Sequence, residues 1–218
     1  MNTFTATNQE LVILYLSHDL NTDLGEPNYA SFTQDEWNEL LGQLTGLSHL
    51  FVSPNPASVD LTMLTLGDFI GGQAAVVVVV EPSGPGITLG GFAAQGYYTP
   101  ANFNVYNQYS DTNDLGTMEN GQLDKLKAQR PNPDAGYFLL SWTLTQDSTQ
   151  AATCAVTDDS ILNLAATANG ALSSSLLPAC SAQTYPNIIL IDGVNSSDIT
   201  ALAMEVNSMA IGDPTASP

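Results

Sequence analysis

Side chains that could do chemistry follow short apolar runs at five places in this 218-residue chain. An imidazole exchanges protons near neutral pH, carboxylates serve as acids or bases, and amide, phenol and indole groups donate hydrogen bonds to a substrate. The candidates are His18, Glu81, Asn107, Tyr109, Trp142 and Asp192. They would form one site if the runs before them were neighbouring parallel strands.

The runs have the composition of strands buried on both faces. They are rich in Val, Ile and Leu without strict alternation, and cover residues 11–16, 75–80, 103–106, 137–140 and 188–191. Segments that favour helices separate most of them, which is typical of a parallel βα architecture. Because the carboxyl ends of such strands build the active site, we expect the six candidates to converge on one face of the sheet.

The segments between the runs predict the remaining elements. Thr33-Gln34-Asp35-Glu36 has the pattern of a capping box that opens a helix. Further helices are expected at residues 61–70, 115–128, 160–177 and 199–209, the last capped by Ser196 or Ser197, and a short sixth strand at residues 50–52. Residues 81–102 have no helical period and predict a long loop. We expect one domain over residues 1–211 and a frayed tail at 212–218.

The charge of the chain is strongly negative. Three Lys and Arg side chains oppose 22 Asp and Glu, for a formal net charge of −19. Such a surface repels nucleic acid and anionic lipid headgroups, so no nucleic-acid partner is expected. The carboxylates are explained by solubility; cation binding is the alternative, but the sequence has no Asp-x-Asp-x-Asp calcium loop. No apolar stretch reaches membrane-spanning length.

Two cysteines, Cys154 and Cys180, flank the helix expected at residues 160–177. No Cys-x-x-Cys motif is present, which disfavours a zinc site or a redox motif. We expect a disulfide between them, and hence an oxidising compartment; free buried thiols are the alternative. Met1 is not followed by the basic and apolar segments of a signal peptide. A disulfide without an export signal predicts a chain that lacks the beginning of a longer protein.

Four segments, taken in order, carry a resemblance to a known family. They are residues 11–19 (LVILYLSHD), 31–37 (SFTQDEW), 104–110 (NVYNQYS) and 185–195 (YPNIILIDGVN). This set resembles the phosphatidylinositol-specific phospholipase C-like phosphodiesterases, particularly the secreted fungal and bacterial type. The resemblance covers nearly the whole chain and implies strands four to eight of an irregular TIM-like barrel. The implied fold is therefore an incomplete (βα) barrel of five to six parallel strands, from an extracellular family.

The resemblance also implies a reaction, the hydrolysis of a phosphoric diester in lipid metabolism. In the family one histidine removes the proton of the inositol 2-hydroxyl, a second protonates the departing diacylglycerol oxygen, and an arginine neutralises the phosphoryl charge. Here His18 and His49 are the only histidines and Arg130 the only arginine. Neither histidine stands in the family's Gly-Thr-His-Asp setting, and Arg130 lies between a helix end and a proline. We therefore expect the chain to lack the catalytic histidine pair and to hydrolyse phosphatidylinositol negligibly.

The remaining strand-end residues are assigned by the same resemblance. His18 matches a polar or basic position that follows the fourth strand of the family and reaches the substrate pocket; the alternative is a loop histidine bonded to Asp19 or to its polar turn. Asp192 matches the acid after strand eight that orients a catalytic histidine; the alternative is a carboxylate that caps the next helix. Asn107 and Tyr109 match a pair that contacts the inositol ring. Glu81 and Trp142 are further substrate-binding candidates only because they also follow strand ends. No metal or cofactor is expected. The partners expected are a phosphodiester or lipid headgroup and, through an open barrel edge, a further copy. The competing function is a non-catalytic, acidic extracellular binding protein derived from that fold.

Overall fold

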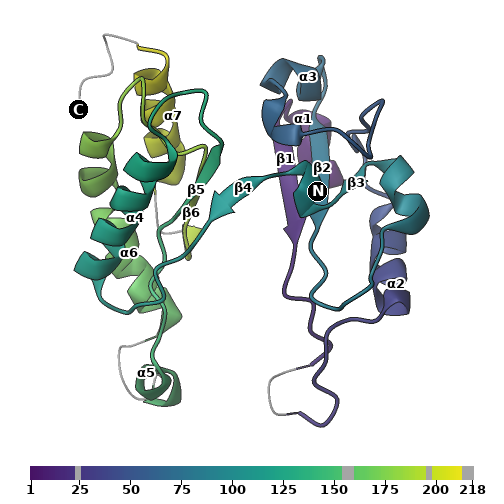
Figure 1. Cartoon of the computed structure of the whole chain (residues 1–218), viewed down its shortest axis with the longest axis horizontal. Helices are drawn as coiled ribbons and strands as arrows, with labels where there is room; N and C mark the ends of the chain where they lie inside the picture. The colour runs from purple at the N-terminus through teal and green to yellow at the C-terminus, as the bar shows by residue number, and fades with distance from the viewer. Residues whose placement is uncertain (23–25, 154–159, 195–197, 213–218) are drawn as a thin grey trace. The chain divides into compact units, whose positions relative to one another are not determined.

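The structure is a computed structural model of the chain, and it describes residues 1–22, 26–153, 160–194 and 198–212. The chain divides into two compact units, Met1–Asn104 and Val105–Pro218. Both appear in Figure 1. A division into compact units does not decide whether they form one domain, so the single domain expected over residues 1–211 stays a prediction. Of the expected tail, only Gly212 lies among the described residues.

The first unit alternates helices with parallel strands. In chain order its elements are α1 (Asn2–Thr7), β1 (Leu11–Leu16), α2 (Gln34–Leu44), η1 (Leu61–Met63), α3 (Leu66–Ile70), β2 (Ala75–Val80), η2 (Gly90–Gln95), β3 (Tyr97–Tyr98) and η3 (Pro100–Asn102). The bounds of β1 and β2 are those predicted from their apolar runs. Helix α1 was not predicted, and the helix expected at residues 61–70 is divided into η1 and α3.

The sheet of this unit has the order β1-β2-β3, and its ladders are parallel. Leu11 pairs with Ala75 and Leu16 with Val80, so β1 runs beside β2 along its whole length. The prediction of a loop across Tyr97–Tyr98 is wrong, because these residues pair with Val78 and Val79 as β3. The strand expected at residues 50–52 is reduced to one parallel bridge, from Leu50 to Val76.

Helix α2 covers one face of this sheet. Val76, Val78 and Val80 form a buried cluster with Trp37 and Leu41 of α2. The predicted capping box is confirmed at the start of the helix. The Thr33 hydroxyl accepts from the Glu36 backbone N–H at 3.3 Å, and Glu36 Oε2 accepts from the Thr33 backbone N–H at 2.7 Å. These bonds satisfy donors that every helix start leaves open, and so fix where α2 begins.

The second unit repeats the pattern with shorter strands. Its elements are β4 (Val105–Asn107), α4 (Leu115–Gln129), β5 (Tyr137–Ser141), α5 (Ser148–Thr153), α6 (Ile161–Leu176), η4 (Leu177–Ala179), β6 (Ile188–Leu190) and α7 (Ile199–Ala210). The strands pair in the order β4-β5-β6, again in parallel. Helix α5 was not predicted, whereas α4, α6 and α7 lie where their patterns place them.

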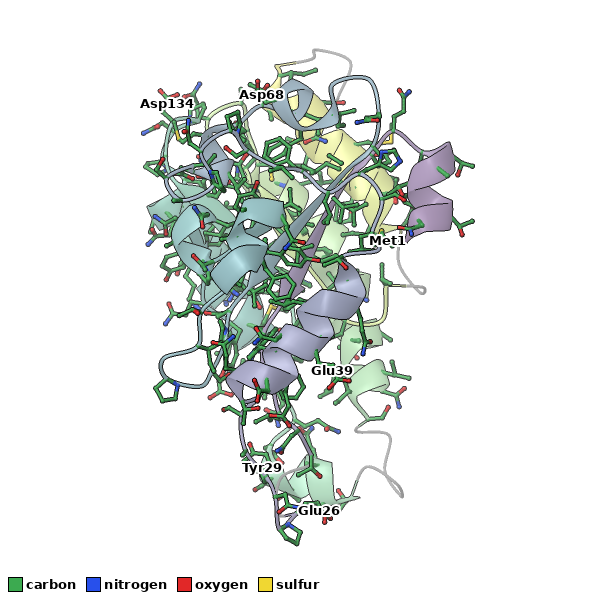
Figure 2. The ribbon with its side chains drawn as sticks, turned by 90° about the vertical axis from the view of Figure 1, so that its right-hand side faces the viewer. Met1, Glu26, Tyr29, Glu39, Asp68 and Asp134 are labelled. Carbon is green, nitrogen blue, oxygen red and sulfur yellow. The ribbon has the colours of Figure 1, made fainter. Side chains whose placement is uncertain are left out.

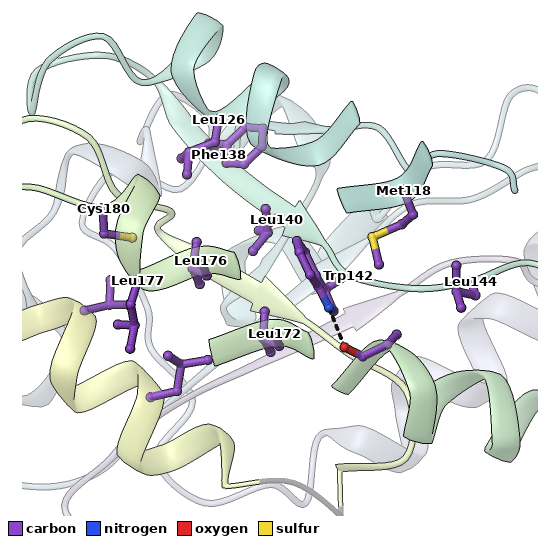
Figure 3. Packing of buried hydrophobic residues seen from close by; sticks show 13 residues of the cluster. Met118, Leu126, Phe138, Leu140, Trp142, Leu144, Leu172, Leu176, Leu177 and Cys180 are labelled. Atoms are coloured by element: carbon purple, nitrogen blue, oxygen red, sulfur yellow. Dashed lines mark hydrogen bonds between the residues drawn. The ribbon is translucent and has the colours of Figure 1, made fainter. Parts of the chain in front are cut away.

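The core of this unit lies on one face of its sheet, shown in Figure 3. Alternate side chains of β5, Phe138 and Leu140, point into it because side chains alternate along a strand. The helices contribute Met118 and Leu126 from α4, Leu172 and Leu176 from α6, and Leu202 and Val206 from α7. The three helices thus cover the same face.

The predicted α/β class is therefore confirmed, with parallel pairing between all named strands. The described strands form two open three-stranded sheets rather than a closed barrel. Among the described residues, no helix is both long and apolar enough to cross a membrane.

Candidate functional site

His18 stands in an exposed turn that follows β1. Its backbone φ is +56°, a left-handed conformation that is uncommon for a residue with a side chain. The Ser17 hydroxyl lies 2.9 Å from its Nδ1. The side chain is exposed, and in the part of the chain that the structure describes Nε2 makes no hydrogen bond. The alternative reading of His18, a loop histidine bonded to its own turn, is compatible with this geometry.

Asp19, the next residue, has a different environment. Its carboxylate is buried and accepts two hydrogen bonds, from Trp37 Nε1 at 2.9 Å and from the Ser83 backbone N–H at 2.7 Å. Burial raises the pKa of this carboxyl, but the hydrogen bonds from Ser83 and Trp37 outweigh burial, so the pKa lies below its ordinary value. Asp19 therefore joins the turn after β1 to helix α2 and to the loop after β2.

Glu81 follows β2 and lies, like the turn that holds His18, at the carboxyl ends of the strands. Its backbone N–H donates to the Leu16 carbonyl at 2.8 Å, and its Oε2 accepts from the Tyr15 hydroxyl at 2.9 Å. Burial first, and then the hydrogen bond to Glu81 and its negative charge, raise the pKa of Tyr15 to about 12. Glu81 thus forms a carboxylate–phenol pair with Tyr15, which keeps its proton at physiological pH.

His49, the other histidine, lies at the opposite end of this sheet. Its carbonyl accepts from the Val76 backbone N–H at 2.8 Å, near the start of β2, and its φ is +63°. It lines a cavity of about 210 Å³ together with Thr5, Gln9 and Gln73. His18 follows the carboxyl end of β1, so the two imidazoles of the chain do not form an acid–base pair within this unit.

A second, more open hollow of about 320 Å³ lies beside α2. Leu20 and Asn21, which follow the His18 turn, line it together with Phe32, Glu36, Glu39, Leu40 and Gln43. Glu36 and Glu39 give it an acidic wall. A neutral polyol or a cationic group fits such a wall better than a bare phosphate does.

The strand ends of the second unit hold the other predicted residues. Asn107, the last residue of β4, is exposed, and Tyr109 is 58 % exposed. Asp192 is half-buried just beyond β6, and its carbonyl accepts from Asn169 Nδ2 at 2.8 Å. Asn169 Oδ1 is buried and has no hydrogen-bond partner. Asp192 does not cap the next helix, because α7 has Asp198 at its N-cap; Ser196 and Ser197, the predicted caps, lie outside the described residues.

Trp142 is fully buried, unlike these three residues. Its indole N–H donates to the Ala168 carbonyl of α6 at 2.8 Å, the bond drawn as a dashed line in Figure 3. The side chain therefore packs in the core and presents no surface to a ligand.

Gln122 positions the β4 end, and sequence analysis did not single it out. This fully buried side chain of α4 donates to the Gln108 carbonyl at 2.9 Å and accepts from the Ser141 backbone N–H at 3.1 Å. It thus joins the loop after β4 to the end of β5. The sequence signal is its spacing. Gln122 lies four residues from both Met118 and Leu126, in the buried stripe of α4.

Arg130, the only arginine, is also a structural residue. It is buried, donates from Nε to the Tyr185 carbonyl at 3.2 Å and from Nη1 to the Gly136 carbonyl at 3.2 Å, and lies 4.9 Å from the centre of the Tyr185 ring. A guanidinium held by backbone carbonyls in this way is not available to a phosphoryl group.

Cys180 is buried, and burial raises the pKa of its thiol to about 11. Its predicted partner, Cys154, lies outside the described residues, so the disulfide stays a prediction. Among the residues that the structure describes, no group of three or more His, Cys, Asp or Glu side chains is arranged to hold a metal ion.

The predicted site residues are therefore grouped by unit. His18 and Glu81 follow adjacent parallel strands of the first unit, and Asn107, Tyr109 and Asp192 follow strands of the second. Convergence of all of them on one face stays a prediction. No match was found in comparisons with protein-family models, with curated proteins or with solved structures.

Proposed function

We propose that this chain binds a phosphodiester headgroup, of the phosphoinositide kind, at the carboxyl ends of its parallel strands. In this proposal the two units are parts of a phospholipase C-like βα barrel. The observation that carries it is the placement of His18 and Glu81 just beyond the carboxyl ends of the adjacent parallel strands β1 and β2. His18 supplies a free imidazole nitrogen, and Glu81 supplies an acceptor for a sugar hydroxyl.

The same site is not expected to complete a hydrolysis. General acid–base cleavage of a phosphodiester uses one group to remove a proton and another to protonate the leaving oxygen. Only His18 follows a strand end, because His49 lies at the other end of its sheet and Arg130 is occupied by backbone carbonyls. The proposal is therefore binding with at most one proton-transfer group, whereas the phosphodiesterases that the sequence resembles use two histidines.

The test is a titration of the whole chain with myo-inositol 1-phosphate, followed by amide chemical shifts. We expect saturable shifts at Ser17–Asp19 and Glu81, lost in His18→Ala and kept in the control His49→Ala. Because the chain carries −19, added salt should strengthen binding of this anion by screening the repulsion. Absence of saturable shifts up to about 10 mM, beyond the usual range of substrate KM values, would refute the proposal.

A parallel assay measures inositol phosphate release from phosphatidylinositol vesicles, and we expect only background. A turnover near about 1 per second, the lower end of ordinary enzymes, with a sharp loss in His18→Ala, would make His18 catalytic and the binding-only proposal wrong.

A second candidate function is an acidic binding protein for a basic partner. The observation that favours it is the fate of the three basic side chains. Arg130 is buried, and Lys125 Nζ donates to the carbonyls of Gln108 and Tyr109, which leaves Lys127 exposed. Exposed carboxylates such as Glu26, Glu39, Asp68 and Asp134, labelled in Figure 2, therefore meet little positive charge. Binding of a lysine-rich peptide that weakens steeply with salt, without any response to inositol phosphate, would favour this function.

A further inference from the structure

Strand β1 is an edge strand of its sheet. The sheet order β1-β2-β3 places β2 on one side of it and, among the described residues, no strand on the other. The Ala75 N–H donates to the Glu10 carbonyl at 3.0 Å and the Glu81 N–H to the Leu16 carbonyl at 2.8 Å. Alternate residues of a parallel strand bond to the same neighbour. The N–H and C=O groups of Leu11, Ile13 and Tyr15 therefore point away from β2.

This edge lacks the features that normally block pairing with another chain. Proteins protect an edge with charges, with proline, with a bulge or by making the strand very short. Strand β1 is six residues long, LVILYL, and contains no charge, Pro or Gly. Ile13 is 39 % exposed and Tyr15 44 % exposed. By contrast, the other edge of the same sheet, β3, has two residues and is soon followed by Pro100.

The residues on this edge are complementary to themselves. In an antiparallel pair of two β1 strands centred on Ile13, each Ile13 stands opposite its copy and Leu11 stands opposite Tyr15 of the other copy. All outward-pointing residues then face outward-pointing residues, and each such pair exchanges both backbone hydrogen bonds. The side chains that meet are apolar or aromatic, a favourable cross-strand combination.

We propose that a second copy of this chain pairs with β1 in this way, as a two-fold symmetric dimer with a continuous sheet. A two-fold interface uses the same surface on both subunits, so β1 can serve as both halves of the contact. Each chain carries a net charge of −19, so long-range repulsion opposes the contact. The dimer is therefore weak and forms more readily as salt screens the charges. This proposal does not depend on the headgroup site.

The test is sedimentation velocity of the whole chain at increasing protein concentration, in about 50 mM and about 500 mM NaCl, on either side of a Debye length of about 10 Å. We expect a monomer–dimer equilibrium that shifts toward dimer at high salt. Ile13→Lys should raise the dimer dissociation constant about tenfold or more, because two like charges would face each other. Met63→Lys is the matched control: it changes the net charge equally at a side chain 78 % exposed in the same unit, and should leave dimerisation unchanged.

Amide hydrogen exchange of the wild-type chain gives an independent readout that needs no variant to fold. Dimerisation should slow exchange at Leu11, Ile13 and Tyr15, while Val12, Leu14 and Leu16 are protected in monomer and dimer alike. A chain that stays monomeric at every concentration and salt would overturn the proposal. So would a dimer that Ile13→Lys leaves intact, or one without added protection at the three outward amides.

Discussion

Asp19 is the side chain on which the loops at the β1 and β2 ends depend. It is a buried carboxylate that accepts from two N–H donors, the Trp37 indole and the Ser83 backbone. His18, its neighbour, is exposed. Adjacent residues of the same turn thus differ in role: Asp19 holds the turn in place, whereas the side chain of His18 is exposed to solvent.

Replacing Asp19 by Asn should destabilise the chain, because an amide nitrogen would face one of the two N–H donors. An unsatisfied buried donor costs about 1–3 kcal/mol, and urea unfolding at pH 7 should show a loss of that size. The control Asp35→Asn alters an exposed carboxylate of α2 and should have little effect.

The pH dependence of this variant gives a second check. The pKa of Asp19 is lowered in the folded state, so its contribution to stability is present above the pKa of the unfolded chain, about 3.9. That contribution is lost as pH falls from there through the lower folded pKa. The difference in unfolding free energy between wild type and Asp19→Asn should therefore shrink as the solution is acidified. A difference that stays constant down to about pH 2 would contradict this role.

Among the elements, the long uninterrupted strands were the most predictable. Six contiguous apolar residues fix both β1 and β2, and the Thr33–Glu36 capping box fixes the start of α2. Strand β3 was missed because two residues are too few to show the alternation of a strand. It is preceded by Gly96, which has φ +93° and lies so close to residue 51 that a Cβ would be 2.6 Å from the Phe51 carbonyl oxygen. Such a close approach depends on tertiary structure, which the local sequence does not record.

The sequence predicted which candidate site residues follow a strand, but it did not predict which of them are exposed. The run before Trp142 gives its position, but burial follows from side-chain alternation. Phe138 and Leu140 face the helices, and Trp142 continues the same face. Counting residues by two along β5 would therefore have placed Trp142 in the core. Asn107 and Tyr109, by contrast, are exposed beyond a strand of three residues.

Gln122 joins the loop after β4 to the end of β5 in the second unit, as Asp19 joins loops in the first. Its replacement tests how β4 and β5 are held together. Gln122→Leu keeps the volume but leaves the Ser141 N–H without its acceptor and the Gln108 carbonyl without one of its donors. We expect a loss of about 3 kcal/mol in unfolding free energy. Met118→Leu, in the same buried stripe, is the control and should cost less than about 1.5 kcal/mol. Equal stability of the two variants would show that the bonds to Gln122 contribute nothing.

The whole chain carries a large negative charge, formally −19. Twenty-two acidic side chains oppose three basic ones, and two of the three basic side chains are used to hold backbone carbonyls. Mutual repulsion of this kind keeps copies apart in solution and also destabilises the compact state. In the dimer proposed above, attraction along the uncharged β1 edge competes with this repulsion, and the balance depends on salt.

The same repulsion predicts how stability responds to salt. In protein dilute enough to be monomeric, raising NaCl from about 10 mM to about 500 mM shortens the Debye length from about 30 Å to under 5 Å. The carboxylates then repel one another less in the folded chain, where they are closer together than in the unfolded one. The urea midpoint should rise over this range, with KCl giving the same curve because screening depends on ionic strength alone.

A charge-reversal variant tests the same effect. Glu39→Lys replaces an exposed carboxylate of α2. It should raise the urea midpoint at low salt and make the midpoint depend less on salt concentration, whereas the neutral exchange Asn38→Gln should change neither. A midpoint that is independent of salt, or a Glu39→Lys variant with the wild-type slope, would mean that the charge is too dispersed to affect folding.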